Sequence, residues 1–152
     1  MPRLLLILTT IFSATVVLPA WAEKVDMSPA ALTNVATHVL TGQVKAVYQQ
    51  IEEDGDWKHV SYLAEVHVGD CEKGEGIKKG DLVYVRYWRR SFIGKGLPPF
   101  DTSGHRGLPT KQQYVRVYLS RNAYDGFGHN KDGGFNVIGA NGFEILKAAS
   151  SK

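Results

Sequence analysis

The chain has 152 residues, of which 43% are hydrophobic and 22% are charged, and its formal net charge is +3. This length suits one domain that is large enough to bury a single hydrophobic core. The small excess of positive charge, together with the export signal described next, argues against a polyanionic partner, and we expect no nucleic acid to bind.

The first 22 residues have the pattern of a secretory signal peptide. One basic residue, Arg3, precedes an apolar run from Leu4 to about Leu18, and Ala20-Trp21-Ala22 forms an A-x-A cleavage site ahead of Glu23. The run is shorter than the roughly 20 residues that span a bilayer. We therefore predict that residues 1–22 are removed, that the protein is periplasmic or secreted, and that no membrane span remains.

The sequence contains a single cysteine, Cys71. An exported protein with one cysteine has no internal disulfide, so burial of the core must stabilise the fold. Two interpretations stay open: Cys71 is a small, half-buried residue at a strand end, or it forms an intermolecular disulfide or a reactive thiol. The sequence does not determine the oligomeric state.

The mature chain opens with a short helix that leads into a strand. Ser28 and Pro29 are residue types typical of an N-cap and a first helical position, which predicts a helix from Pro29 to about Thr37. Apolar residues then alternate from His38 to Gln50. This pattern predicts a half-buried strand with a bend or bulge at Gly42.

Further strands follow a hairpin turn at Asp54-Gly55. The alternation from Trp57 to Val68 predicts the return strand, with Val60, Tyr62, Ala64, Val66 and Val68 facing inward. The segment Leu82–Trp88 is apolar at almost every position, which predicts a central strand covered on both faces. Later strands are expected at Tyr114 to Leu119, Gly134 to Ile138 and Gly142 to Leu146, before a frayed tail at 148–152.

Five or six short strands, one flanking helix and no alternation of strands with helices predict an all-β fold. We expect a single domain over residues 23–147 with the architecture of a five- to six-stranded antiparallel OB-like Greek-key barrel. A small β-sandwich is the alternative, because the strand pattern alone does not separate the two.

Two segments carry a family pattern: THVLTGQVKAVY and YLAEVHVGDCEKGEGIKKGDLVYVRYW. They resemble the prokaryotic TIMP-like or netrin-like (NTR) secreted domains, whose opening strand carries a small-residue, apolar, Gly-x-Val pattern and whose next strand ends in a Lys-Gly turn. The resemblance covers roughly residues 30–90 and implies an OB-like barrel with an extracytoplasmic binding role. The motifs SGHRGLP and DGGFNVIGANGFEIL also resemble secreted bacterial proteins of unassigned chemistry.

The chain departs from the animal members of this family in its cysteines. Those members carry paired cysteines, and their protease inhibition depends on a cysteine at the mature N-terminus, whereas this mature chain is expected to begin at Glu23. The resemblance therefore implies neither protease inhibition nor any catalytic residue.

A loop from 91 to 111 is much longer than the roughly four to six residues usual in compact domains, which indicates either function or disorder. Its apolar anchors, among them Phe92, Ile93, Leu97, Phe100 and Leu108, argue against disorder. The candidate ligand-binding residues lie in this loop or beside it: Trp88, Arg89, Arg90, Asp101, His105 and Arg106.

Arginine and aromatic side chains together suit the binding of a carboxylate, a phosphate or a glycan ring, because a guanidinium donates paired hydrogen bonds and stacks. The alternative is that Asp101 pairs with one of these arginines and fixes the loop to the barrel. His105, between Gly104 and Arg106, is expected to expose its ring on a tight turn, and a loop histidine that donates to a backbone carbonyl is the alternative to a catalytic or metal-binding role. Because spacing fixes no partner for it, we assign no catalytic residue, metal ligand or cofactor.

Two weaker patterns are explained better by ordinary structure. Glu65 and His67 share one strand face, but two potential ligands do not make a metal site, and a solvated face is the simpler interpretation. Tyrosines and arginines on neighbouring strands would suit single-stranded nucleic acid, but export and the near-neutral charge argue against it.

We therefore predict an exported, non-enzymatic binding domain that contacts a protein or an envelope component through the 89–109 loop. One alternative is a small extracytoplasmic hydrolase or metal-binding protein that uses His105 and Asp101. A third possibility is a purely structural envelope protein, which predicts an obligate oligomer.

Overall fold

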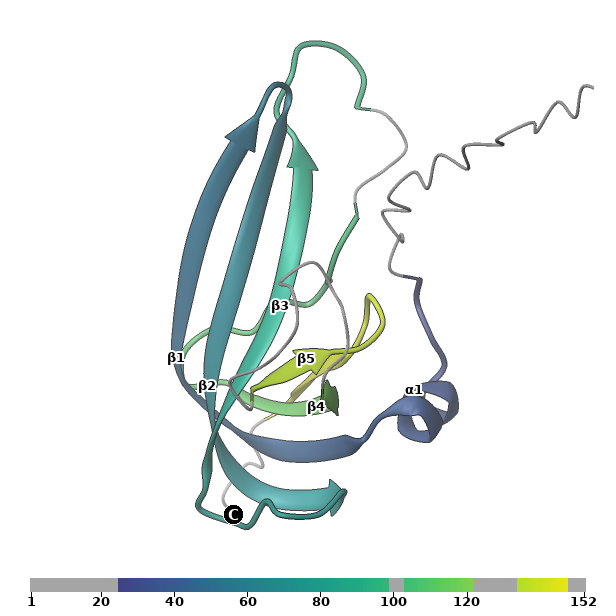
Figure 1. Ribbon diagram of the computed structural model, residues 1–152, viewed down its shortest axis with the longest axis vertical. Helices are drawn as coiled ribbons and strands as arrows, with labels where there is room; N and C mark the ends of the chain where they lie inside the picture. Colours follow the sequence, from purple (N-terminus) through teal and green to yellow (C-terminus); the bar gives the residue numbers. More distant parts are fainter. Residues whose placement is uncertain (1–24, 99–102, 122–133, 148–152) are drawn as a thin grey trace, which may run out of the picture.

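The computed structural model describes residues 25–98, 103–121 and 134–147. In chain order the elements are α1 (Pro29–Val35), β1 (His38–Asp54), β2 (Trp57–Lys73), β3 (Leu82–Phe92), β4 (Tyr114–Arg121), β5 (Phe135–Val137) and β6 (Phe143–Leu146) (Figure 1). No helix among these residues is long and apolar enough to cross a membrane.

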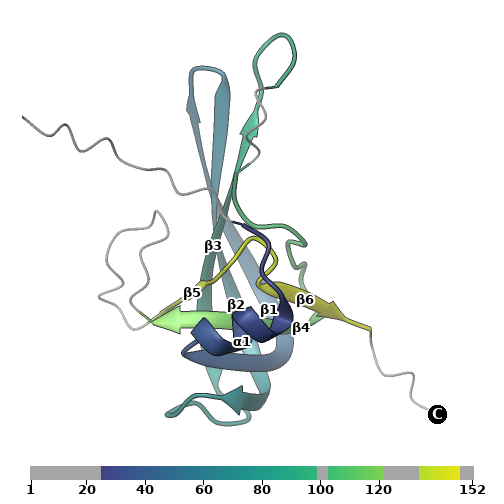
Figure 2. The ribbon, with the colours of Figure 1, turned by 90° about the vertical axis from the view of Figure 1, so that its right-hand side faces the viewer.

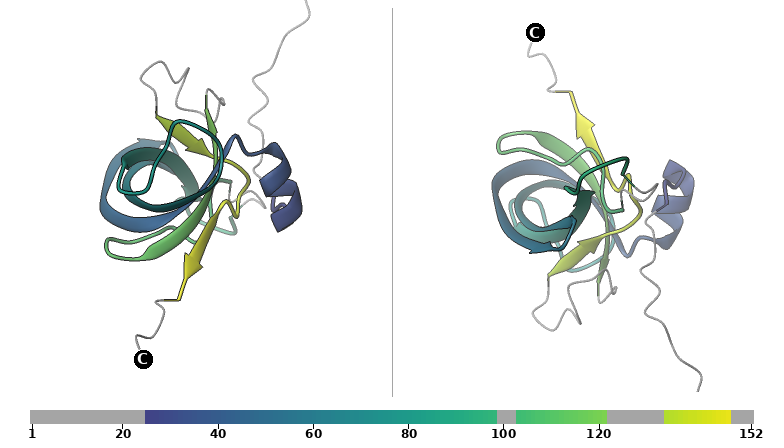
Figure 3. Two further views of the ribbon diagram at one scale, coloured as in Figure 1. Left: turned by 90° about the horizontal axis from the view of Figure 1, so that it is seen from below. Right: turned by 90° about the horizontal axis from the view of Figure 1, so that it is seen from above.

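Five strands close into a ring. The sheet order is β1-β2-β3-β5-β4-β6, and a further pairing joins β1 to β4, so that β6 alone among the described strands lies outside the ring (Figure 3). The predicted fold class, a mostly β protein with one short helix and a barrel-like arrangement, is confirmed. The continuous ring also favours a barrel over two separate sheets.

One pairing differs from the antiparallel expectation. β3 and β5 are parallel at Val85–Phe135 and Arg86–Asn136, whereas the other pairings are antiparallel. The cause is geometric, because a ring with an odd number of strands cannot alternate in direction all the way around.

β1, β2 and β3 are longer than the sequence pattern predicted. Their pairing continues to Asp54–Trp57 in one ladder and Trp57–Phe92 in the other, while β4 pairs with β1 only as far as Gln43. The three strands therefore project beyond the ring as an extension (Figures 1 and 2). In β1 and β3 the added residues lie at the exposed tip of the extension, where polar and apolar residues no longer alternate. In β2 they are residues 69–73 at the opposite end, where the strand pairs with β1 in the ring.

The predicted irregularity at Gly42 is confirmed. The register of β1 against β2 shifts between Thr41 and Gly42 and again between Val44 and Ala46. A Cβ atom at Gly42 would lie 2.4 Å from the carbonyl oxygen of His67. Only glycine allows β2 to approach so closely where β1 leaves β4 and enters the extension.

The main core fills the ring. It is built from the inward-facing residues of all the strands and includes Leu40, Val44, Ala64, Val66, Val85, Tyr87, Val117 and Phe135. The predicted inward set of β2 is confirmed for its valines and alanine, with Tyr62 half-buried and stacked on Tyr87 at 4.9 Å. Burial raises the pKa of the Tyr87 hydroxyl.

The prediction that the first part of β3 is covered on both faces is wrong. Val83, Val85 and Tyr87 are buried, but Leu82 and Tyr84 are each 46% exposed. No described helix covers the outer face of β2 and β3, because α1 packs beside β4 instead. Apolar and aromatic residues on this exposed face produced the continuous apolar run in the sequence.

α1 begins as predicted and ends slightly earlier. The Ser28 hydroxyl accepts a hydrogen bond from the Ala31 N–H at 3.2 Å, and the helix stops at Val35. Leu32 is buried with Ala36 and Tyr118 in a second, smaller core. The helix therefore closes one side of the ring next to β4.

Polar side-chain contacts join β2, β4 and β6. Arg116 of β4 donates to both carboxylate oxygens of Glu72 at 3.0 and 3.1 Å and to Glu144 at 3.1 Å, which links β2, β4 and β6. Nearby, Cys71 is a free, half-buried thiol that donates to the carbonyl oxygen of Lys73 at 3.3 Å.

Candidate functional site

The loop after β3 returns to the strand it leaves. The Arg90 N–H donates to the carbonyl oxygen of Ser103 and the His105 N–H to that of Trp88, at 2.9 and 2.8 Å. Gly104 lies opposite Arg89 in an isolated antiparallel bridge. Residues 103–105 thus extend the sheet at the upper edge of β3, and the loop is integrated into the fold.

Gly104 permits this close approach. Its φ of +122° is rarely adopted by other residues, and a Cβ atom there would lie 2.7 Å from the carbonyl oxygen of Trp88. The glycine that suggested an exposed turn in the sequence is instead required for backbone contact with β3.

His105 is buried, contrary to the expectation of an exposed ring. It is 2% exposed, and its Nε2 lies 3.0 Å from the carbonyl oxygen of Val137. Its Nδ1 lies within hydrogen-bond distance of two backbone groups of Trp88, the N–H at 3.1 Å and the carbonyl oxygen at 3.0 Å. The imidazole joins β3, β5 and the loop, and neither nitrogen faces solvent as a general base would.

Trp88 and Arg90 belong to a stack on the outer face of the extension. The His59 ring is parallel to the Trp88 ring at 5.4 Å, and the Arg90 guanidinium lies 4.2 Å from the centre of the Trp57 ring. Phe92 meets Trp57 edge-on at 5.4 Å. These contacts stiffen the extension, and each covers one face of a tryptophan ring.

Burial lowers the pKa of His59, and the positive charge of Arg90 lowers it further, while Glu52 acts in the opposite direction. The neutral imidazole is therefore favoured in the stack. Sequence reasoning had placed His59 on the outer face but missed Trp57. Trp57 lies beside the exit of β3 because the β2–β3 ladder pairs it with Phe92, and the Asp54-Gly55 turn fixes only the register of β1 against β2.

Arg89 and Arg106 lie apart from this stack. Arg89 points to the opposite face of β3 from Trp88 and Arg90, because adjacent strand residues alternate. It lines a shallow hollow of about 300 Å³ with Arg106 and residues 103–105 and 107. Arg106 pairs with Asp26 at 2.7 Å, and both side chains are largely exposed.

The six candidate residues therefore divide into separate environments. Trp88 and Arg90 are in the stack, whereas Arg89, Arg106 and the buried His105 all line the hollow. Asp101 lies outside the described residues, and so does the expected pairing of Asp101 with an arginine.

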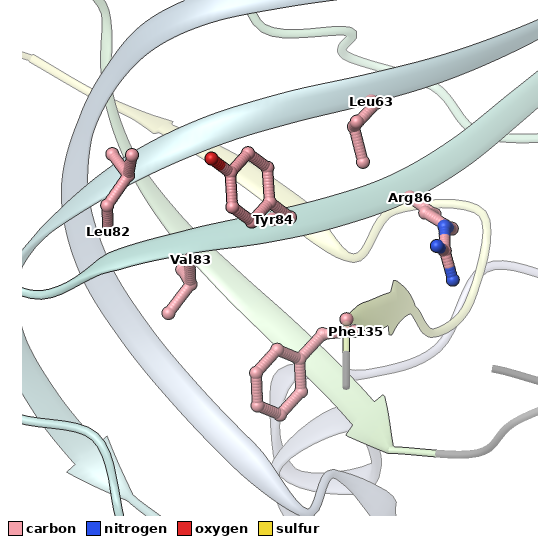
Figure 4. A pocket seen from close by; sticks show the side chains of 7 residues that line it. Leu63, Leu82, Val83, Tyr84, Arg86 and Phe135 are labelled. Carbon is pink, nitrogen blue, oxygen red and sulfur yellow. The ribbon is translucent and has the colours of Figure 1, made fainter. Parts of the chain in front are cut away.

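A second hollow lies on the outer face of the ring, where residues of β2, β3 and β5 meet. It has a volume of about 210 Å³ and is lined by Leu63, Leu82, Val83, Tyr84, Arg86, Gly134 and Phe135 (Figure 4). Beside it the Tyr48 hydroxyl donates to Glu65 at 3.3 Å, and the carboxylate raises the pKa of Tyr48. Glu65 thus pairs with a tyrosine, and the described part of the chain brings no three His, Cys, Asp or Glu residues together as a metal site.

The beginning of the loop forms an apolar tip at the far end of the extension. Leu97 is 94% exposed and Ile93 is 48% exposed. The Ile93 N–H donates to the carbonyl oxygen of Asp56 at 2.8 Å, which attaches the loop to the β1–β2 turn. The large aliphatic side chains of Ile93 and Leu97 are therefore exposed on a loop whose first residues are hydrogen-bonded to the β1–β2 turn.

Comparisons of the chain with models of protein families, with curated proteins and with solved structures give no match. The resemblance to TIMP-like domains therefore stays a prediction. The fold and the surfaces described above define a β-rich, barrel-like protein with a projecting three-stranded extension.

Proposed function

We propose that the protein is an exported, non-enzymatic binding domain that captures a protein component of the cell envelope through the loop tip, Ile93–Leu97. The observation that carries this proposal is the 94% exposure of Leu97 beside Ile93 at the end of the extension. Aliphatic side chains exposed together at a projecting tip are typical of a contact surface that a partner covers.

The tip is held by the fold on both sides. Ile93 is hydrogen-bonded to the β1–β2 turn, and residues 103–105 are paired with β3. Below the tip, the stack of Trp57 and Arg90 stiffens the extension. A loop with fixed ends loses less conformational entropy when it binds, which favours recognition by such a surface.

The signal-peptide pattern supports an extracytoplasmic location, and the TIMP-like resemblance supports a binding role. The rival hydrolase hypothesis needs an accessible base. His105, its proposed base, is 2% exposed and has both ring nitrogens hydrogen-bonded to backbone groups. The binding hypothesis is therefore the better supported of the two.

Site-specific photo-crosslinking in intact cells tests the proposal. A photoreactive residue in place of Leu97 should give one dominant protein adduct, and Ile93→Asp should abolish it. The same residue in place of Lys79, which is exposed on the turn before β3, is the matched control. The proposal fails if position 97 gives no protein adduct or gives the same adducts as position 79.

A further inference from the structure

The outer edge of β1 is unpaired along the extension. Gln43 is the last β1 residue that pairs with β4, and Val44 exchanges hydrogen bonds with Gln112 and Gln113. From Lys45 to Asp54, no described residue outside β2 pairs with the strand. At about 3.4 Å per residue, this edge is about 30 Å long.

The residues of this edge do not protect it. Exposed edge strands normally carry charge or proline in the middle, which prevents pairing with another chain. The six residues from Ala46 to Ile51 contain neither, and Tyr48 and Ile51 are 54% and 46% exposed. Charge is confined to the two ends, with Lys45 at one and Glu52, Glu53 and Asp54 at the other.

The edge is complementary to itself when two copies run antiparallel with Gln49 at the two-fold axis. Val47 then lies opposite Ile51, and Tyr48 opposite Gln50. Lys45 of each copy comes beside Glu52 and Glu53 of the other, so two sets of opposite charges meet. The bulge at Lys45, whose ammonium donates to Gln43 in the single chain, leaves a long flexible side chain that reaches these carboxylates.

Other arrangements are less favourable. A parallel pair would place the acidic ends side by side, and moving the axis toward the tip would bring the glutamates of both copies together. Moving the axis toward the ring shortens the ladder, because Gln112 and Gln113 already occupy the edge at Val44. Charge thus selects one register, and like charges directly opposite one another are destabilising in sheets.

We propose that two copies of the protein associate through the β1 edge, Lys45–Glu53, as an antiparallel, two-fold symmetric pair that joins the two sheets. This interface is isologous, so that each residue contact occurs twice. It is independent of the loop tip, since β1 and the loop lie on opposite sides of the extension (Figure 1).

Sedimentation velocity of the purified protein from about 1 to about 300 µM tests the pair. We expect a reversible dimer. Lys45→Glu and Glu53→Lys should each raise its dissociation constant about tenfold, because two contacts per dimer become repulsive. The double variant Lys45→Glu/Glu53→Lys should return to within about threefold of the wild type. Lys79→Glu makes the same charge change away from the edge and should have no effect.

A monomer at every concentration overturns the proposal, and so does a dimer that responds equally to Lys45→Glu and Lys79→Glu. Failure of the double variant to restore dimerisation also overturns the register. Amide hydrogen exchange gives the remaining outcome. If the protein stays a monomer and residues 46–51 become protected from exchange only when an extended peptide is added, a peptide strand and not a second copy occupies the edge, and the proposal is overturned.

Discussion

His105 donates from Nε2 to the carbonyl oxygen of Val137 at 3.0 Å. Its other nitrogen, Nδ1, contacts the backbone N–H and carbonyl oxygen of Trp88 at 3.1 and 3.0 Å. β3 and β5 pair only at Val85–Phe135 and Arg86–Asn136, so the imidazole continues the connection between them where their own hydrogen bonds end. The long loop is thereby fastened to the ring at the level where the extension begins.

Replacing this histidine should destabilise the whole fold. His105→Ala removes two buried hydrogen bonds and leaves a cavity, and we expect the free energy of unfolding to fall by about 2–4 kcal/mol. Urea denaturation measures the change. His67→Ala, an exposed histidine of β2, is the control and should lie within about 0.5 kcal/mol of the wild type. Equal stability of the two variants would contradict the role assigned to His105.

Gly42 should tolerate no side chain. In Gly42→Ala the new Cβ atom would lie 2.4 Å from the His67 carbonyl oxygen, so β1 and β2 must separate at the bulge. We expect a loss of about 2 kcal/mol or more in the free energy of unfolding. Gly69→Ala, in β2, is the matched control, because its Cβ would find its nearest atom at an ordinary 3.4 Å. A loss no larger than that of Gly69→Ala would refute the steric argument.

Residue alternation and local turn chemistry predicted much of the fold. The inward face of β2, the bulge at Gly42 and the N-cap at Ser28 all follow from local patterns, and the structure has them. Coverage of β3 does not follow from such patterns. An outer face with Leu82 and Tyr84 has the same residue types as a buried one, and only the position of α1 beside β4 shows that no helix of the described residues covers it.

The candidate site was predictable only in part. The return of the loop does bring His105 to Trp88, with the two rings edge-on at 6.2 Å, but it buries the imidazole. Strand alternation turns Arg89 away from Trp88 and Arg90. A glycine beside His105 is equally consistent with an exposed turn and with close backbone pairing. The pairing partner, Trp88, lies on another segment of the chain, and this long-range register was not available from the sequence.

The stack on the extension should make stability depend on pH. The pKa of His59 is lowered in the folded protein, whereas in the unfolded chain it is near 6.5. Above pH 6.5 both states are neutral and the contribution of His59 is fully present. As the pH falls through 6.5 toward the folded pKa, the unfolded state binds the proton first and stability is lost.

NMR titration of the His59 ring measures this effect directly. Arg90→Gln removes a positive neighbour and should raise the pKa of His59, and Glu52→Gln removes a negative one and should lower it. His59→Phe keeps an aromatic ring against Trp88 and should abolish this part of the pH dependence of unfolding. A wild-type midpoint at or above 6.5, or shifts of the same sign in the two charge variants, would contradict the proposed environment.

Shortening a leucine should lower the stability of the fold at Leu40, in the ring, and leave it unchanged at Leu97, on the loop tip. Leu40 is fully buried in the ring, and Leu40→Ala should lower the free energy of unfolding by about 2–5 kcal/mol. Leu97 is 94% exposed, and Leu97→Ser should leave it within about 0.5 kcal/mol of the wild type. Thermal and urea unfolding of the purified variants measure both. A large loss with Leu97→Ser would mean that Leu97 stabilises the fold, in which case its exposure would no longer support a partner-binding tip.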